Sequence, residues 1–440
     1  MISMLLFYLS QLSTLVLSFA YMPVLSFVGY QIIYFMYHPA RWWYGGVPSL
    51  RYSLVFSLLV LGHAALYKIR GNGLRFGTSP PVICMFLLVA WYGAVNLWAF
   101  SPITHAFAFE HFVKTVVIAA AAYCLCDTRK GLDYLMIGYV LGAAYIGYYA
   151  YQFGRTGGGR VEGIGMVDSP DVNDVAAMLA PAAVFALHLF WRYEKLWQRV
   201  LVVIAGAFIV NSLVLMSSRG AFLGVSLGSA YYMGRLFFAP VPVPNLKAKV
   251  IGIGLAGVLG LLYVVDDIAI SRFASLREEA RVEDTSRQRG STRIYFWLAA
   301  FEMTKDYPLG LGAGGFVLNS HRYIREDVDT GRSRNRAAHS SWFQTLTEVG
   351  YPGFALFAGM LGFVGLGLGK ARKQMVLNGD NRGFFVVVGV QSACLAYLVA
   401  MTFIDRMRAE ALYWLVLMGA AAYQIYFVGT FQQKNQGRKR

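Results

Sequence analysis

The sequence predicts an all-α polytopic membrane protein with about twelve transmembrane helices and one large, partly helical loop. Of its 440 residues, 57% are hydrophobic and only 14% are charged, and the mean hydropathy is +0.50. Soluble domains carry about 25% charged residues, so the composition excludes an ordinary soluble protein. Apolar runs of about 20 residues, the length that crosses a bilayer as a helix, recur along the whole chain.

Twelve apolar segments define the predicted spans. The first contains Pro23 and is too long for one simple span, so we expect a kinked helix or a tight hairpin there and a total of twelve or thirteen spans. The segments cover residues 3–37, 49–67, 80–99, 107–126, 132–153, 173–191, 200–216, 220–238, 250–265, 342–369, 383–404 and 411–430.

One polar connection, residues 266–341, stands apart from the short loops. It is rich in arginine, and loops of this length in compact proteins are usually functional or disordered. Within it, TRIYFWLAAFEMTK (292–305) has the amphipathic pattern of a helix at the membrane surface. We therefore predict three parts: transmembrane helices one to nine in 1–265, a loop domain in 266–341, and helices ten to twelve with a basic tail in 342–440.

Basic residues in the short loops predict the orientation. The tail QQKNQGRKR is placed in the cytoplasm because cytoplasmic loops carry an excess of Lys and Arg. Counting back span by span puts the other basic loops on the same side and the long loop on the opposite, outer side. The net charge of +16 then reflects basic loops and sites for phosphate or anionic lipid, and no nucleic-acid partner is predicted.

Polar residues from distant segments converge on the outer side. Three precede or open transmembrane segments, and three belong to the long loop. This convergence is the main functional signal in the sequence. The residues are Arg160, Asn173, Arg219, Arg289, Arg293 and His339.

Two of these arginines stand at the start of helices. Arg219, in SSRGAFLG, either snorkels at its helix end or pairs with an anion, a carboxylate or a phosphate. Arg293 opens the amphipathic helix, where an arginine alone is typical of a solvated or headgroup-facing surface. Because several arginines share this side, the pattern favours a site for a diphosphate.

Two further groups of charges have the spacing of known functional motifs. Asp327 and Asp329 have the DxD spacing of some metal-dependent glycosyltransferases, but nothing nearby completes a coordination sphere, so no metal site is predicted. Glu110 and Lys114 are spaced to form an ion pair on one helix. A proton relay that includes His111, as in a transporter, is the alternative.

His339 opens the segment HSSWFQTLTEVGYPG. A lone histidine near a membrane interface is more often a structural hydrogen-bond donor than a catalyst. Here it precedes a helix, whose N-terminal dipole disfavours the imidazolium form, and it lies on the side of the arginines. Both features favour a neutral ring that can act as a base.

Four motifs then occur in a characteristic order. They are GRVEGIGMVDSPDVNDVAAMLAP, SSRGAFLG, RIYFW followed by DYPLGLGAGGF, and HSSWFQTLTEVGYPG. Together, over roughly residues 155–365, they resemble the O-antigen ligase superfamily, which also contains O-antigen polymerases and protein O-oligosaccharyltransferases.

The resemblance implies an inverting, metal-independent glycosyltransferase of the GT-C type, without cofactors, in the bacterial inner membrane. Such a ligase moves a glycan from undecaprenyl diphosphate to lipid A–core on the periplasmic side during lipopolysaccharide biosynthesis. An O-antigen polymerase or a protein O-oligosaccharyltransferase would use the same donor. A lipid-linked glycan transporter or flippase is the alternative of another class.

Motif positions also assign roles by resemblance. His339 corresponds to the essential histidine of the family, and Arg219 and Arg293 correspond to its diphosphate-binding arginines. Asn173 matches an asparagine at the start of a span and is expected to shape the site. Arg160 and Arg289 are expected to do the same.

Overall fold

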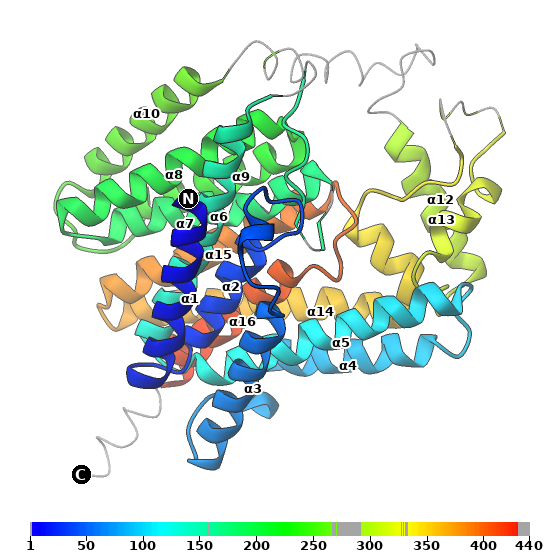
Figure 1. Ribbon diagram of the computed structural model, residues 1–440, viewed down its shortest axis with the longest axis horizontal. Coiled ribbons are helices and arrows are strands. Elements are labelled where there is room, and N and C mark those ends of the chain that lie inside the picture. The colour runs from blue at the N-terminus through cyan, green and yellow to red at the C-terminus, as the bar shows by residue number, and fades with distance from the viewer. Residues whose placement is uncertain are drawn as a thin grey trace.

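The computed structural model describes residues 2–155, 159–166, 168–169, 171–265, 270, 292–326, 328, 330 and 333–429. Across these ranges the protein is built from helices and has no β-sheet (Figure 1). Nine of the described helices are long and apolar enough to cross a membrane, and two shorter apolar helices accompany them. The predicted all-α polytopic membrane fold is therefore confirmed.

Each predicted apolar segment contains one helix, except that the first contains two, which pack against each other. Short 3₁₀ turns lie at Tyr44–Gly46, Phe76–Thr78 and Ser320–Arg322. The helices are α1 (Ile2–Ala20), α2 (Leu25–Met36), α3 (Tyr52–Ile69), α4 (Pro80–Val95), α5 (Pro102–Leu125), α6 (Arg129–Phe153), α7 (Val172–Arg192), α8 (Leu196–Met216), α9 (Arg219–Phe237), α10 (Leu246–Val264), α12 (Thr292–Asp306), α13 (Gly315–Asn319), α14 (Ser341–Leu377), α15 (Asn381–Met401) and α16 (Glu410–Tyr423, continuing as a π-helical turn Gln424–Val428).

Local sequence explains where several helices begin. Pro80 and Pro102 stand in the first turns of α4 and α5, where a missing N–H costs nothing. Side chains of Thr128, Asp171 and Asp380 accept hydrogen bonds from backbone N–H groups in the first turns of α6, α7 and α15. These caps set the entry points of three core helices.

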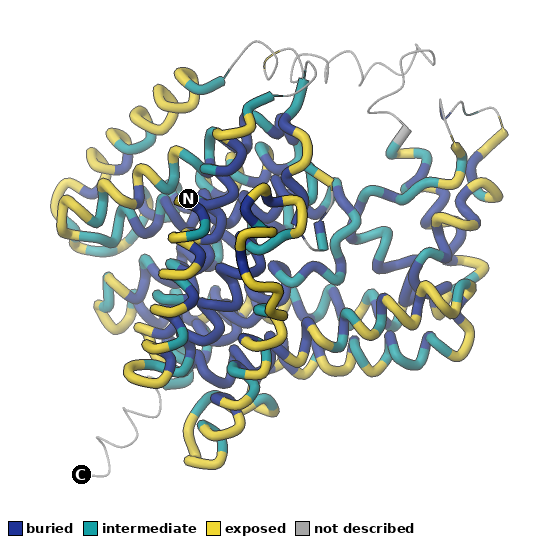
Figure 2. The backbone as a smooth tube through the Cα atoms, viewed as in Figure 1, coloured by how far each residue is buried: buried dark blue, intermediate teal, exposed yellow. Residues whose placement is uncertain are grey.

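Burial separates central helices from peripheral ones (Figure 2). In the most apolar membrane-length stretch of each helix, 78% of the residues are buried in α7 and in α16 with its π-turn, whereas only 6% are buried in α10. A helix that is apolar all round is stable only in a protein core or in lipid. The apolar faces that α1, α3, α8 and α10 expose are consequently lipid-facing surface.

Small residues allow the central helices to pack closely. A Cβ atom on Gly224 of α9 would lie 2.4 Å from the carbonyl oxygen of Ala396 in α15, and one on Gly228 would lie 2.8 Å from the Ala396 Cβ. Glycines at four-residue spacing are a common means of close helix packing in membranes. They fix α9, whose first residue is Arg219, against α15.

Contacts among loops define one end of the bundle, which we call the basic end (residues 68–79, 126–133, 192–199 and 370–382). Its loops are the ones that the sequence places in the cytoplasm. Ion pairs across this end join Arg192 with Asp133, Arg129 with Asp380, and Arg382 with Glu194.

The loops predicted to lie outside meet at the other end of the bundle. The Phe100 N–H donates to the Leu311 carbonyl at 2.9 Å, and the Val161 N–H donates to the Leu215 carbonyl at 3.1 Å. The loops therefore group into two ends as their alternation in the sequence predicts. Which end faces the cytoplasm stays a prediction.

Helix α14 is interrupted at Gly350, which has φ +62° and ψ −169°. The segment DYPLGLG packs into this interruption: the Leu311 N–H donates to the Thr347 carbonyl and the Tyr351 N–H donates to the Pro308 carbonyl, both at 2.9 Å. These bonds satisfy backbone groups that the break leaves without helical partners. They also hold the first turns of α14 rigidly in place.

Gly350→Ala is expected to destabilise the protein by about 1–3 kcal/mol. Alanine disfavours the positive φ at this position, and its Cβ would lie 2.2 Å from the Pro308 carbonyl oxygen. Thermal unfolding of the purified protein in detergent measures the effect. Gly362→Ala in the same helix is the control, because a Cβ at Gly362 meets nothing within 4 Å; equal melting temperatures for the two variants would contradict the prediction.

Candidate active site

His339 stands immediately before α14 in a constrained backbone conformation. Its φ is +50°, in the left-handed region that non-glycine residues seldom adopt. The carboxylate of Asp405 accepts hydrogen bonds from the backbone N–H of His339 at 2.9 Å and of Ser340 at 3.0 Å. The His339 side chain remains 43% exposed, and its Nδ1 lies 3.8 Å from the Asp405 carboxylate. The ring is thus oriented and open to a ligand.

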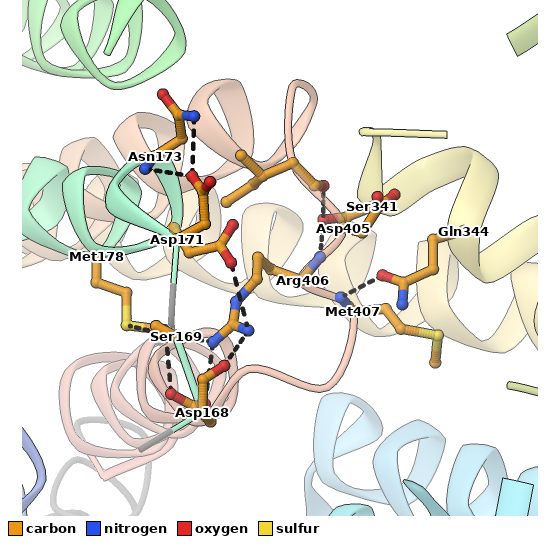
Figure 3. A network of polar contacts seen from close by, with 12 residues as sticks. Asp168, Ser169, Asp171, Asn173, Met178, Ser341, Gln344, Asp405, Arg406 and Met407 are labelled. Carbon is orange, nitrogen blue, oxygen red and sulfur yellow. Dashed lines mark hydrogen bonds and ion pairs between the residues drawn. The ribbon is translucent and has the colours of Figure 1, made fainter. Parts of the chain in front are cut away.

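The loop between α15 and α16, residues 402–409, supports the start of α14 (Figure 3). The Ser341 hydroxyl donates to the Ile404 carbonyl at 2.7 Å and accepts from the Arg406 N–H at 2.9 Å. The Met407 N–H donates to the Gln344 side-chain oxygen at 3.2 Å. We call this segment the 402–409 loop.

Arg406 fastens the 402–409 loop to the segment that precedes α7. Its side chain, 11% exposed, forms ion pairs with Asp168 at 3.2 Å and Asp174 at 3.8 Å, and it donates to the Ser169 hydroxyl (Figure 3). An arginine buried among carboxylates is already neutralised, and loss of one partner from such a set is strongly destabilising. Arg406 therefore organises the site and does not present a free charge to a substrate.

The predicted residues Arg160 and Asn173 lie together where the chain enters α7. The Asn173 N–H and side-chain amide donate to the Asp171 carboxylate at 2.7 and 2.9 Å. The Asn173 side-chain oxygen accepts from the Arg160 guanidinium at 3.0 Å. This arrangement caps α7 and ties Arg160 to its first turn. The site-shaping role of both residues stays a prediction.

Arg293 lies on the first turn of α12, near enough to His339 for its charge to lower the pKa of that ring. One turn along, the Trp297 indole N–H donates to the Ala338 carbonyl at 2.9 Å, and its ring stacks on Phe343 with 5.6 Å between centroids. Helix α12 thereby packs on the residue before His339 and on the first turn of α14. The long loop and α14 are joined at this point.

Arg219, the first residue of α9, lies beside the 402–409 loop. A Cβ atom on the adjacent Gly220 would be 3.1 Å from the side chain of Phe403. The ring of Phe403 also lies 6.4 Å from that of Trp297. The helices that carry Arg219 and Arg293 therefore meet the same loop residue, and that loop also holds His339.

The surroundings lower the pKa of His339 below its ordinary value of about 6.5. Burial is the largest cause; the nearby Asp405 carboxylate opposes it, and the positive charges of Arg293 and Arg336 lower the pKa further. The ring is therefore neutral at neutral pH and can accept a proton.

Some predicted residues fall outside the part of the chain that the structure describes. Arg289 is one, and Asp327 and Asp329 of the DxD motif are the others. Within the described ranges, no three His, Cys, Asp or Glu side chains are grouped so as to hold a metal ion. The described site is thus built from a histidine, arginines and carboxylates.

Sequence reasoning missed the 402–409 loop. Asp405 and Arg406 are not among the predicted site residues, although both contact segments far away in the chain. Arg408 extends the same network by pairing with Glu348 of α14 and donating to the Tyr92 hydroxyl. A signal was present: DRMRAE (405–410) places four charges in a short stretch between two apolar spans.

Comparison with known proteins gives a family match that spans most of the candidate site. Residues 175–358 match the family model described as O-Antigen ligase, and the match includes Arg219, Arg293 and His339. No curated protein gave a match to the chain. The family match over residues 175–358, together with the confirmed helical membrane fold, supports membership of the O-antigen ligase superfamily.

Proposed function

We propose that the protein is an O-antigen ligase that moves a glycan from undecaprenyl diphosphate to lipid A–core on the periplasmic side of a bacterial inner membrane. The match to the O-Antigen ligase family model supports glycosyl transfer of the ligase or polymerase type. The observation that carries the finer proposal is a neutral, accessible histidine beside two helices that each carry an arginine in the first turn.

In the proposed reaction, His339 is the general base. The Asp405 carboxylate near Nδ1 favours the tautomer whose proton is on that nitrogen, so Nε2 accepts the proton of the acceptor hydroxyl. The hydroxyl oxygen forms a bond to the anomeric carbon as the bond to the diphosphate oxygen breaks on the opposite face. The configuration at that carbon is inverted, and the bonding electrons leave with the diphosphate.

Arg219 and Arg293 stabilise the departing diphosphate. Charge develops on its bridging oxygen as the glycosidic bond breaks, and guanidinium groups stabilise such charge through bidentate hydrogen bonds. Because both arginines stand at helix N-termini, the helix dipoles add partial positive charge at the same place. This arrangement supplies the positive charge that a metal ion supplies in other glycosyltransferases.

Asp405 is proposed to position His339. Activity should be constant near neutral pH and fall as the pH drops through the lowered pKa of His339, because the base is then protonated. Asp405→Asn removes the negative charge that raises the pKa of His339. The acid limb of the pH–rate profile should therefore move to lower pH, while the maximal rate falls. Initial rates between about pH 5 and pH 8 test this; an acid limb that stays in place would indicate a merely structural role for Asp405.

A complementation experiment tests the proposed activity. In a strain that lacks its own ligase, the wild-type chain should restore lipopolysaccharide bearing polymer, visible as a ladder on gels. A membrane-inserted wild-type protein that gives no ladder, with a donor known to be compatible, would contradict the assignment as a ligase and leave polymerase or protein glycosylation as the candidates.

The transporter alternative rested on charges in the fourth apolar segment. In the structure Glu110 and Lys114 of α5 form an ion pair at 2.5 Å, and their side chains are 65% and 66% exposed. The pair therefore lies on the outer surface of the bundle and does not line a path through its interior. This arrangement favours the simple ion-pair explanation over a proton relay.

A further inference from the structure

A second polar feature lies at the basic end, away from the candidate active site. Helix α14 runs across the bundle from the side of α12 and α13 (Figure 1), and its last turns reach the basic end. There a cavity of about 410 Å³ is lined by Arg235 of α9 and by Arg372 and Lys373 of α14. Phe238 and Phe384 form part of its apolar wall, and no acidic side chain lines it.

An apolar cavity of about 220 Å³ lies between α9, α14, α15 and α16. Leucines and valines from α14, α15 and α16 form most of its wall, and Gly365 of α14 widens it. A side chain at Gly365 would meet nothing within 4 Å of its Cβ. Such a space suits a hydrocarbon chain.

Arg372 connects the two cavities. It lines the basic cavity, and its guanidinium donates to the Tyr231 hydroxyl at 2.8 Å and to the Gln391 side-chain oxygen at 3.0 Å, both of which line the apolar cavity. The guanidinium of Arg235 lies 5.8 Å from the centre of the Tyr231 ring. Two neutral partners orient Arg372 but leave its charge uncompensated.

Carboxylates at this end are engaged elsewhere. Asp380 pairs with Arg129 at 2.6 Å, and Glu194 pairs with Arg382 at 2.7 Å. Within the part of the chain that the structure describes, the three basic residues of the cavity have no ion-pair partner. Three positive charges beside an apolar cavity suit an anion with an apolar body.

We propose that these two cavities bind one anionic phospholipid of the surrounding bilayer. Its phosphate contacts Arg235, Arg372 and Lys373, and one acyl chain enters the apolar cavity. Basic pockets between transmembrane helices favour anionic headgroups, with each basic residue near the surface contributing to the attraction. This lipid site is distinct from the proposed donor site, because His339, Arg219 and Arg293 lie at the opposite end of the bundle.

Native mass spectrometry of the full-length protein, delipidated and then titrated with phosphatidylglycerol or phosphatidylethanolamine, tests this inference. The wild type should retain one phosphatidylglycerol, and Arg235→Gln with Arg372→Gln should weaken its retention at least about tenfold. Gly365→Leu, which fills the apolar cavity, should weaken it as well. Arg382→Gln and Gly362→Leu are the matched controls at the same end and in the same helix, and both should bind as the wild type does.

Three outcomes would overturn the inference. Equal retention of the two lipids would show that the headgroup charge is not recognised. Loss in the arginine variant without loss in Gly365→Leu would indicate a site for a free anion, and unchanged binding in both would show no lipid site here. If the double variant aggregates, Lys373→Glu, whose side chain is exposed, carries the same prediction.

Discussion

His339→Ala is expected to abolish polymer-bearing lipopolysaccharide while leaving the protein in the membrane. Loss of a general base slows a reaction by roughly 10²–10⁴-fold, which would bring the ladder below detection. The side chain is 43% exposed, and the bonds that hold this residue to Asp405 come from its backbone N–H and that of Ser340. Alanine keeps those bonds, so the effect should fall on catalysis and not on folding.

His321→Ala is the matched control for this variant. His321 belongs to the same long loop, is exposed, and bonds through its ring to Asn335 at 2.7 Å. We expect normal ladders from it. A normal ladder from His339→Ala, at equal protein abundance on immunoblots, would remove the general base from the mechanism.

Replacing Arg219 or Arg293 by glutamine is expected to lower the turnover rate by about 10²–10³-fold in each case. Both are proposed to stabilise charge that develops on the leaving diphosphate, so kcat should fall more than KM rises. Lysine should restore only part of the rate, because an ammonium group lacks the planar fork that binds two phosphate oxygens at once.

Arg322 provides the control, because it is exposed and belongs to the same long loop (266–341) as Arg293. Arg322→Gln should keep the wild-type rate. Combining the Arg219 and Arg293 substitutions should cost less than the product of the single effects if the two residues act on one diphosphate. Single effects that simply multiply would show that the two arginines act independently, which would contradict a shared diphosphate. A change in KM alone would show that they attract the substrate and do not act in the reaction.

The helices were predictable from sequence because the bilayer imposes one dominant requirement. Each apolar segment must satisfy its own backbone groups, so length and hydropathy suffice to locate helices such as α7 and α15. The break at Gly350 in α14 was not predictable. It depends on the segment from Pro308 to Gly312, which lies some 40 residues earlier and inserts its own backbone groups there.

The candidate site was predictable only in part. Topology placed Arg219, Arg293 and His339 on one side of the membrane, and the structure adds that the elements carrying them share contacts with the 402–409 loop. Asp405 and Arg406 could not be assigned from their own surroundings, because their partners are reached only through the fold. The four charges of DRMRAE between two apolar spans indicate that this loop has polar partners, but the sequence alone does not identify them.

Purified protein in proteoliposomes, given a defined undecaprenyl-diphosphate-linked glycan, tests the central claim most directly. Product analysis with lipid A–core as acceptor should show transfer with inversion at the anomeric carbon by the wild type and none by His339→Ala. Parallel reactions with a second lipid-linked repeat should yield no polymer. Transfer to the lipid-linked repeat alone would contradict the proposed ligase, and an active His339→Ala would contradict the proposed chemistry.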